Sequence, residues 1–359
     1  MRHEKKVCDV CGKKVNHDTV FCNHCRYPTG LHSAYKISDS ELSSSLSDLV
    51  DVMKTNGTSY YKSKEMEVIF NGLVRLYWLR PETALFRFVE AKILHGYVGK
   101  YLTYPMLDMG CGEGLFTSIL FGANVNEAYD NYESIDITKV DPYNNYIKPP
   151  DDFFIGRPSP IGIGIDFKEN SVRKAMDLRI YDSVNIGDIR YLPYADDHFV
   201  SIFSNMINDI RDNDLGKVFC EAHRVLKSNG HLVFTTPNEK FLDYMYYYNK
   251  KSLDDIGRCD KGRSEWMPRS KLVWSELSQE VGFELVDYTT YGDKNLISYW
   301  DTGFRPFFNI LVALKTQIKK DNLLKIKNIW VELMKAYLHR FVEMQKNNGG
   351  FSVVVMRKV

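Results

Sequence analysis

The sequence predicts an α/β protein built on a doubly wound sheet. Short apolar runs alternate with longer, helix-like segments from about residue 100 to residue 292. The first run passes directly into closely spaced glycines and then into a helix, and two later runs end in aspartate. Such alternation is typical of wound sheets, whose ligands bind at the carboxyl ends of the strands. We therefore expect a ligand site at the glycines and the two aspartates.

The first strand and its loop cover residues 106–114, which read Met-Leu-Asp-Met-Gly-Cys-Gly-Glu-Gly. Three glycines alternate with other residues there: Gly110, Gly112 and Gly114. Glycines at this spacing let the backbone turn tightly and approach a ligand, because no Cβ stands in the way. A helix over residues 115–120 then directs its first amides back toward the ligand. The loop is typical of nucleotide-type cofactor sites, although the glycines alone are a weak signal.

Matching segments follow in order along the chain. They are strands at 161–166 and 183–188 that end in aspartate, an apolar run at 199–203 closed by Ser204-Asn205, a helix end at 221–227, an Asn229-Gly230 turn and a strand at 231–237. This order resembles a class I S-adenosylmethionine (SAM)-dependent methyltransferase. Glu-x-x-Arg-Val-Leu-Lys before the turn and Thr-Pro-Asn after the strand are similar to the small-molecule branch, of the ubiquinone and sugar methyltransferase type. The resemblance implies a seven-stranded, mostly parallel sheet whose last strand runs antiparallel.

The resemblance assigns SAM to the ends of four strands. Asp108 would receive the cofactor's ammonium, and Asp166 would accept both ribose hydroxyls through its two oxygens. Asp188 and the amide of Ile189 would bind adenine. The cofactor-binding positions implied in this way are Asp108, Gly110, Cys111, Gly112, Gly114, Asp166, Phe167, Asp188, Ile189 and Asn205. Taken without the resemblance, an aspartate at a strand end also fits a helix cap.

Candidates for catalysis follow the fourth strand, which faces the methyl group in this family. Asn205 and Asp209 lie there. Methyl transfer requires an aligned nucleophile and, for a hydroxyl acceptor, a group that removes a proton. Asp209 is the candidate base, and capping of the next helix is its alternative role. We expect a turn role for His198 and a packing or surface role for His223. His231 opens a strand at the end far from the cofactor and is a poor candidate for catalysis.

The chain divides into a core with additions. The predicted parts are a zinc module at 1–36, helices over the cofactor cleft at 37–99, a methyltransferase core at 100–292 and 350–359 that contains a lid-like insertion at 121–160, and a helical insertion at 293–349. Because of the first insertion, Asp166 lies 54 residues beyond Gly112, whereas about 20 is usual. That insertion is either a lid or a cover for the sheet edge. Asp130 and Asp136 within it are alternative ribose ligands. The second insertion is either a substrate cover or an oligomer interface.

Four cysteines near the N-terminus predict a structural zinc site: Cys8, Cys11, Cys22 and Cys25. Each Cys-x2-Cys pair forms a tight knuckle, and four thiolates complete a tetrahedron around Zn²⁺. His17 and His24 are alternative ligands. A module this short needs the metal in order to fold. We expect the other cysteines to be packing residues.

Composition narrows the function. The chain has 359 residues and a net charge of +1, so no global field favours nucleic acid or an anionic membrane. No apolar run approaches the roughly 20 residues of a membrane span, and we expect a cytoplasmic, soluble protein. The preferred function is methyl transfer to a small-molecule acceptor, such as a sugar, a lipid-linked compound or a natural product. The alternatives are an RNA methyltransferase that docks RNA through its zinc module, and a non-catalytic SAM-binding scaffold.

Overall fold

The computed structural model describes residues 6–7, 13–15, 39–53, 61, 63–133, 146–156, 158, 160–245, 266–304, 308–342 and 348–359. In the N-terminal module these ranges contain β1 (Lys6–Val7) and β2 (Lys14–Val15), which pair antiparallel with Val7 opposite Lys14. The four predicted zinc ligands lie outside the described residues: Cys8, Cys11, Cys22 and Cys25.

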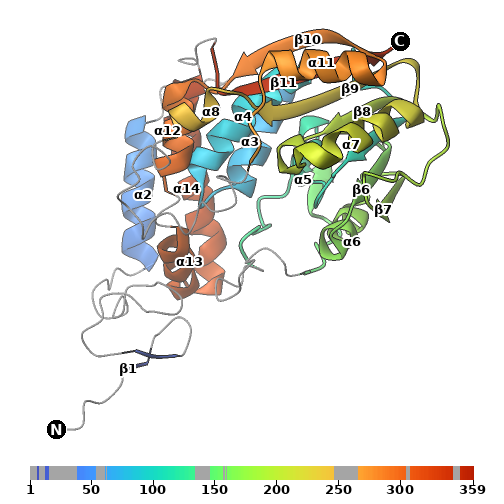
Figure 1. The fold of residues 1–359 in the computed structure, drawn as a ribbon. Helices are drawn as coiled ribbons and strands as arrows, with labels where there is room; N and C mark the ends of the chain where they lie inside the picture. The colour runs from blue at the N-terminus through green and yellow to red at the C-terminus, as the bar shows by residue number, and fades with distance from the viewer. Residues whose placement is uncertain are drawn as a thin grey trace.

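A seven-stranded sheet forms the centre of the fold (Figure 1). Its strands are β3 (Met106–Met109), β6 (Ile163–Asp166), β7 (Ser183–Ile186), β8 (Phe199–Ser204), β9 (Leu226–Pro237), β10 (Phe283–Tyr291) and β11 (Phe351–Lys358). They are arranged in the order β10-β11-β9-β8-β3-β6-β7. The pairs from β9 to β7 are parallel, whereas β11 runs antiparallel to both β9 and β10. The predicted seven-stranded, mostly parallel sheet with an antiparallel last strand is therefore confirmed.

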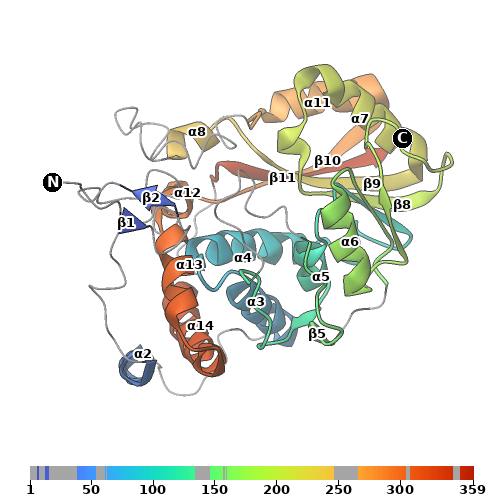
Figure 2. The ribbon, with the colours of Figure 1, turned by 90° about the horizontal axis from the view of Figure 1, so that it is seen from below.

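The sheet has an apolar core on each face. Successive side chains of a strand point to opposite faces, and in β11 Val353 and Val355 join one core while Val354 and Met356 join the other. The helices α7 (Asp212–Val225) and α11 (Lys271–Val281) cover one face, and α5 (Leu115–Leu120) and α6 (Glu169–Leu178) pack on the other. Figure 2 shows α7 and α11 on the opposite side of the sheet from α3, α4 and α5. The predicted doubly wound arrangement is thus present.

A layer of further helices lies beside the sheet (Figure 1). Its members are α2 (Asp39–Met53), α3 (Lys64–Leu76), α4 (Pro81–His95), α12 (Lys294–Thr302), α13 (Phe308–Gln317) and α14 (Lys320–Val342). The short α8 (Phe241–Tyr244) packs against α12. Because α14 packs against α2, α3 and α4, the two predicted helical additions form one layer although they come from opposite ends of the chain. Pro81 occupies the start of α4, where a missing N–H costs nothing.

The described part of the first insertion is attached to this helical layer. Two short strands of the insertion, β4 (Asn124–Val125) and β5 (Phe154–Gly156), pair with each other. The Asp130 carboxylate accepts hydrogen bonds from Trp78 Nε1 at 2.9 Å and from Lys315 Nζ at 2.6 Å. Asp130 therefore belongs to a packing contact and does not compete with Asp166 for a ribose. Asp136 lies outside the described residues.

One predicted boundary is wrong. The helix expected to continue through residues 221–227 ends at Val225, and Leu226 has an extended backbone with φ −77° and ψ 141°. Leu226 is fully buried and pairs with Phe199 of β8, so strand pairing and burial override its helical propensity. The Asn229-Gly230 pair consequently lies within β9 and not between a helix and a strand.

Candidate active site

The glycine loop joins β3 to α5 at the carboxyl end of β3. Gly110 has a φ of 77°, and a Cβ at this position would lie 2.2 Å from Met206 Cγ. Gly112 has a φ of 54°, and no atom of the described chain lies within 4 Å of the place its Cβ would take. Both backbones favour glycine, but only Gly112 faces open space. The loop therefore leaves room for a ligand at Gly112 and packs internally at Gly110.

Asp108 is a buried carboxylate beneath this loop, and its side chain is 2% exposed. Its Oδ2 accepts a hydrogen bond from the Tyr181 hydroxyl at 2.6 Å. Burial, aided by the nearby charge of Asp166, raises the pKa of Asp108 to about 6. No Lys or Arg of the described chain forms an ion pair with it. An incoming cation would complete its environment and stabilise the charged form.

Asp166, at the end of β6, connects two parts of the site. Its Oδ2 accepts the Gly112 amide at 2.9 Å, and its Oδ1 accepts the Lys168 amide at 2.9 Å. Each carboxylate oxygen keeps a second acceptor position. The proposed ribose role and the alternative role of ordering the start of α6 are therefore compatible.

Asp188 follows β7 and is largely engaged by a neighbour. Its two oxygens accept hydrogen bonds from Arg190 Nε at 3.0 Å and from Arg190 Nη2 at 2.7 Å. These bonds lower the pKa of Asp188 below its ordinary value. Arg190 also reaches Asp214 at 3.2 Å. The sequence did not indicate this clamp, and the adenine role of Asp188 and Ile189 stays a prediction.

Asn205 and Asp209 lie beyond β8, as the strand order implies. The Asn205 Oδ1 accepts hydrogen bonds from Thr235 Oγ1 at 2.8 Å and from Arg87 Nη1 at 3.2 Å. Asp209 lies in a 3₁₀ turn, η1 (Ile207–Asp209), where it accepts Asn208 Nδ2 at 2.8 Å. Burial raises the pKa of Asp209. Arg211 precedes the first turn of α7, so Asp209 is not the cap of that helix.

A charged cluster that the sequence analysis did not identify adjoins Asn205. Arg87 Nη1 donates to Glu90 Oε2 at 2.6 Å, and Glu90 Oε1 accepts the Tyr291 hydroxyl at 2.6 Å. Glu90 is 1% exposed and Tyr291 is 2% exposed. The signal in the sequence was an acidic residue on the apolar face of a helix, four positions after the buried Phe86, since an acid placed there requires a buried partner.

Other expected site residues take varied positions. Phe167 is 66% exposed. Cys111 is buried, and burial raises the pKa of its thiol, so it is a packing residue of the loop. Trp300 stacks on Phe86 with ring centroids 4.5 Å apart.

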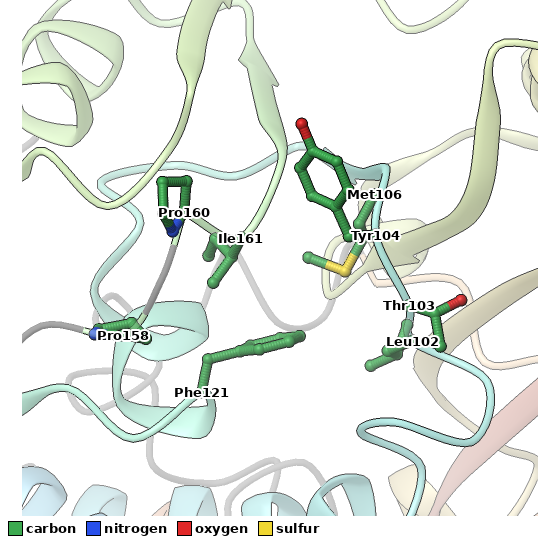
Figure 3. Close-up of a pocket in the computed structure, with 8 residues that line it drawn as sticks. All are labelled: Leu102, Thr103, Tyr104, Met106, Phe121, Pro158, Pro160 and Ile161. Atoms are coloured by element: carbon green, nitrogen blue, oxygen red, sulfur yellow. The ribbon is translucent and has the colours of Figure 1, made fainter.

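A pocket of about 180 Å³ lies at the other end of the sheet (Figure 3). Its apolar lining includes Met106, the first residue of β3, together with Phe121 and Ile161. The glycine loop follows the opposite end of β3. This pocket is therefore separate from the site at the strands' carboxyl ends.

Comparison with known proteins places a methyltransferase signature on part of this framework. Residues 160–234, which contain β6, β7, β8 and most of β9, match the family model described as a methyltransferase domain. A probable polyketide synthase of Dictyostelium discoideum is 23% identical over 235 residues, which is 63% of this chain and 8% of that protein. The chain thus spans a small part of the length of this curated relative.

Among solved structures, the chain is similar to one described as a putative methyltransferase and to one described as a possible methyltransferase. A putative sarcosine dimethylglycine methyltransferase from Galdieria sulphuraria is 14% identical, with a TM-score of 0.42 over 77% of this chain and 87% of that one. A possible histamine N-methyltransferase from Thermotoga maritima is also 14% identical, with a TM-score of 0.41 over 81% and 98%.

Within the described residues no helix is long and apolar enough to cross a membrane.

Proposed function

We propose that this protein is a SAM-dependent methyltransferase that acts on a small-molecule acceptor. The observation that carries the proposal is the hydrogen bond from the Gly112 amide to the Asp166 carboxylate. Because of this hydrogen bond, the Asp166 carboxylate, which we propose accepts hydrogen bonds from the ribose hydroxyls, lies beside the open backbone of the glycine loop. The match of residues 160–234 to a methyltransferase domain supports the same reading.

The residues present fit SAM in charge as well as in shape. Asp108 is buried and has a hydroxyl partner, Tyr181, but no basic partner among the described residues. The charged form of a carboxylate in this environment is stabilised by a nearby ammonium group. The methionine part of SAM carries such a group. Asp166 retains acceptor positions for ribose, and Gly112 leaves the space through which the chain to the sulfonium would pass.

SAM, when bound, supplies an electrophilic methyl group on its sulfonium. The residues of this chain must then exclude water, orient the acceptor and take up a proton where the acceptor is a hydroxyl. Asp209 is our candidate for the last role, because burial raises the pKa of its carboxyl toward the range of a useful base. Asn205, fixed by Thr235 and Arg87, is our candidate for orienting the reacting groups.

Two observations favour a small molecule over RNA as the acceptor. The net charge of +1 provides no broad attraction for polyphosphate, and the polyketide synthase is a relative by sequence. Retention of bulk RNA that weakens steeply with salt would favour the RNA alternative.

The N-terminal cysteines are proposed to hold one structural zinc ion. The pairing of β1 with β2 leaves residues 8–13 as the connection between two paired strands, and both cysteines of the first pair lie in it. Two cysteines three positions apart in this connection fit the first half of a four-thiolate site.

Calorimetric titration with SAM tests the proposed function. Wild type should bind SAM in preference to NAD. Gly112→Val should bind at least about tenfold more weakly, because a branched side chain would occupy the ligand space and strain a positive φ. Gly216→Val is the matched control, since Gly216 lies in α7 and a Cβ there meets no described atom within 4 Å.

Wild type that binds NAD and not SAM, or equal SAM affinity in Gly112→Val and wild type, would refute the cofactor assignment. Transfer of label from SAM to fractions of a cell extract would then separate an enzyme from a non-catalytic SAM-binding protein.

A further inference from the structure

Arg87 is a partly exposed cation at the acceptor side of the site. It lies on α4, and its guanidinium carbon is 5.2 Å from the ring centroid of Phe116 in the first turn of α5. One of its nitrogens reaches Asn205 beyond β8. Arg87 therefore touches both the helix that follows the glycine loop and the segment that we assign to methyl transfer.

Only one nitrogen of this guanidinium, Nη1, has a hydrogen-bond partner among the described residues. Nη1 donates to Glu90 and to Asn205, at 2.6 Å and 3.2 Å. Neither Nε nor Nη2 donates a hydrogen bond to any described residue. The side chain of Arg87 is 29% exposed, whereas that of Glu90 is 1% exposed. The Nε–Nη2 edge is thus available to a ligand.

Buried neighbours hold this edge in place. Glu90 is fixed by the Tyr291 hydroxyl, and Asn205 is fixed by the Thr235 hydroxyl. Tyr291 and Thr235 are each 2% exposed. The charge of Glu90 keeps the pKa of Arg87 above its ordinary value, although burial acts in the opposite direction. Such a rigid, permanently charged fork loses little freedom when a ligand binds.

We propose that the Nε–Nη2 edge of Arg87 binds a carboxylate of a ligand at the methyl-transfer end of the site. Two parallel N–H donors on a planar group match the two oxygens of a carboxylate. The carboxylate comes from the acceptor or from the methionine part of the cofactor. The inference rests on the proposed function and adds to it the chemistry that Arg87 recognises.

The test compares wild type with Arg87→Lys. A lysine keeps a positive charge beside Glu90 but removes the two-donor edge. Arg173→Lys is the matched control, because Arg173 lies on α6 with 57% of its side chain exposed. A double variant, Arg87→Gln with Glu90→Gln, removes both charges together and covers the case in which lysine disturbs the fold.

Calorimetry with S-adenosylhomocysteine and with 5′-methylthioadenosine, which lacks the amino acid part, identifies a cofactor carboxylate. In that case Arg87→Lys should weaken S-adenosylhomocysteine about tenfold or more and leave methylthioadenosine unchanged. For an acceptor carboxylate, S-adenosylhomocysteine should bind both proteins equally. Benzoate should then bind the wild-type complex with S-adenosylhomocysteine more tightly than benzamide does, and Arg87→Lys should lose this preference.

If Arg87→Lys alters neither comparison, the proposal is wrong and Arg87 serves only to hold Asn205. If wild type binds none of the adenosine compounds, the proposed function itself fails, and that result is separable from the first.

Discussion

Replacing Asp108 by asparagine tests the electrostatic reasoning about the cofactor site. The substitution keeps the size of the side chain and an oxygen that can accept the Tyr181 hydroxyl. It removes the buried charge that, in our proposal, receives the ammonium of SAM. Two measurable quantities should change in opposite directions: the affinity for SAM should fall, and the stability of the free protein should rise.

The expected pH dependence of binding follows from the pKa of about 6 for Asp108. At about pH 7.5 almost all of the free protein carries the ionised carboxylate, whereas at about pH 5 roughly a tenth does. Because only this fraction is competent, the apparent Kd of wild type should rise about tenfold between these values. The Kd of Asp108→Asn should be weaker at about pH 7.5 and nearly flat with pH.

The stability effect has the opposite sign. The ordinary pKa of an aspartate is 3.8, below the folded value of about 6. Between these values the folded protein holds more protons than the unfolded chain, so the free energy of unfolding falls as pH rises through 6. A shift of this size corresponds to up to about 3 kcal/mol at pH 7.5. Asp108→Asn should recover part of it in the absence of ligand.

Isothermal calorimetry and urea unfolding at a series of pH values measure both effects, with the exposed Asp182→Asn as control. Wild-type SAM affinity that is constant from pH 5 to pH 7.5 would refute the proposed contact with the ammonium. A variant that is less stable than wild type at pH 7.5 would contradict the description of Asp108 as a buried charge that has no ion-pair partner among the described residues.

Three further predictions concern other parts of the chain. Gly110→Ala should weaken SAM binding at least about tenfold without unfolding the protein. The alanine Cβ would lie 2.2 Å from Met206 Cγ and would displace the loop. Calorimetry measures the affinity, and circular dichroism checks that the variant is folded. Lys327 is 2% exposed, and burial lowers its pKa to about 8. The free energy of unfolding should therefore rise by about 2 kcal/mol between about pH 8 and pH 10. Chemical unfolding of Lys327→Met at the same pH values should show no such rise. Elemental analysis of the full-length protein should find about one zinc per chain, and Cys8→Ser should lose it; a metal-free wild type would contradict the zinc module.

The arrangement of the sheet was predictable because it follows from local patterns. Strands such as 163–166 and 183–186 are short runs on either side of α6, and their order along the chain fixes which ends meet. The packing of the helical additions was not predictable in the same way. The hydrogen bond from Trp330 Nε1 to the Trp78 carbonyl oxygen joins residues 252 positions apart, and no local pattern around either tryptophan indicates its partner.

Some residues of the candidate site were predicted from the sequence, and others were not. Asp108 and Asp166 were predicted because each lies at or next to the carboxyl end of a strand, where ligands bind, and in the structure both lie beside the glycine loop. The clamp of Asp188 by Arg190 was missed, although the two residues lie only two positions apart, because a surface pair of this kind has no distinctive sequence pattern. The cluster around Arg87 was missed because its contacts with Asn205 span 118 positions.

Under the proposed function, this division indicates which residues choose the acceptor. The stretch that matches a methyltransferase domain, residues 160–234, contributes Asp166 and Asn205. Arg87 and Glu90 come from an N-terminal helix, and Tyr291 comes from the end of β10. Arg87 and Glu90 are positioned by the helical layer, whereas Tyr291 is held by the pairing of β10 with β11. Neither of these contacts involves the glycine loop, so they can change without altering it. Under the proposed function, the acceptor is therefore to be sought through the residues that surround Arg87, because a fold by itself does not determine which molecule its site acts on.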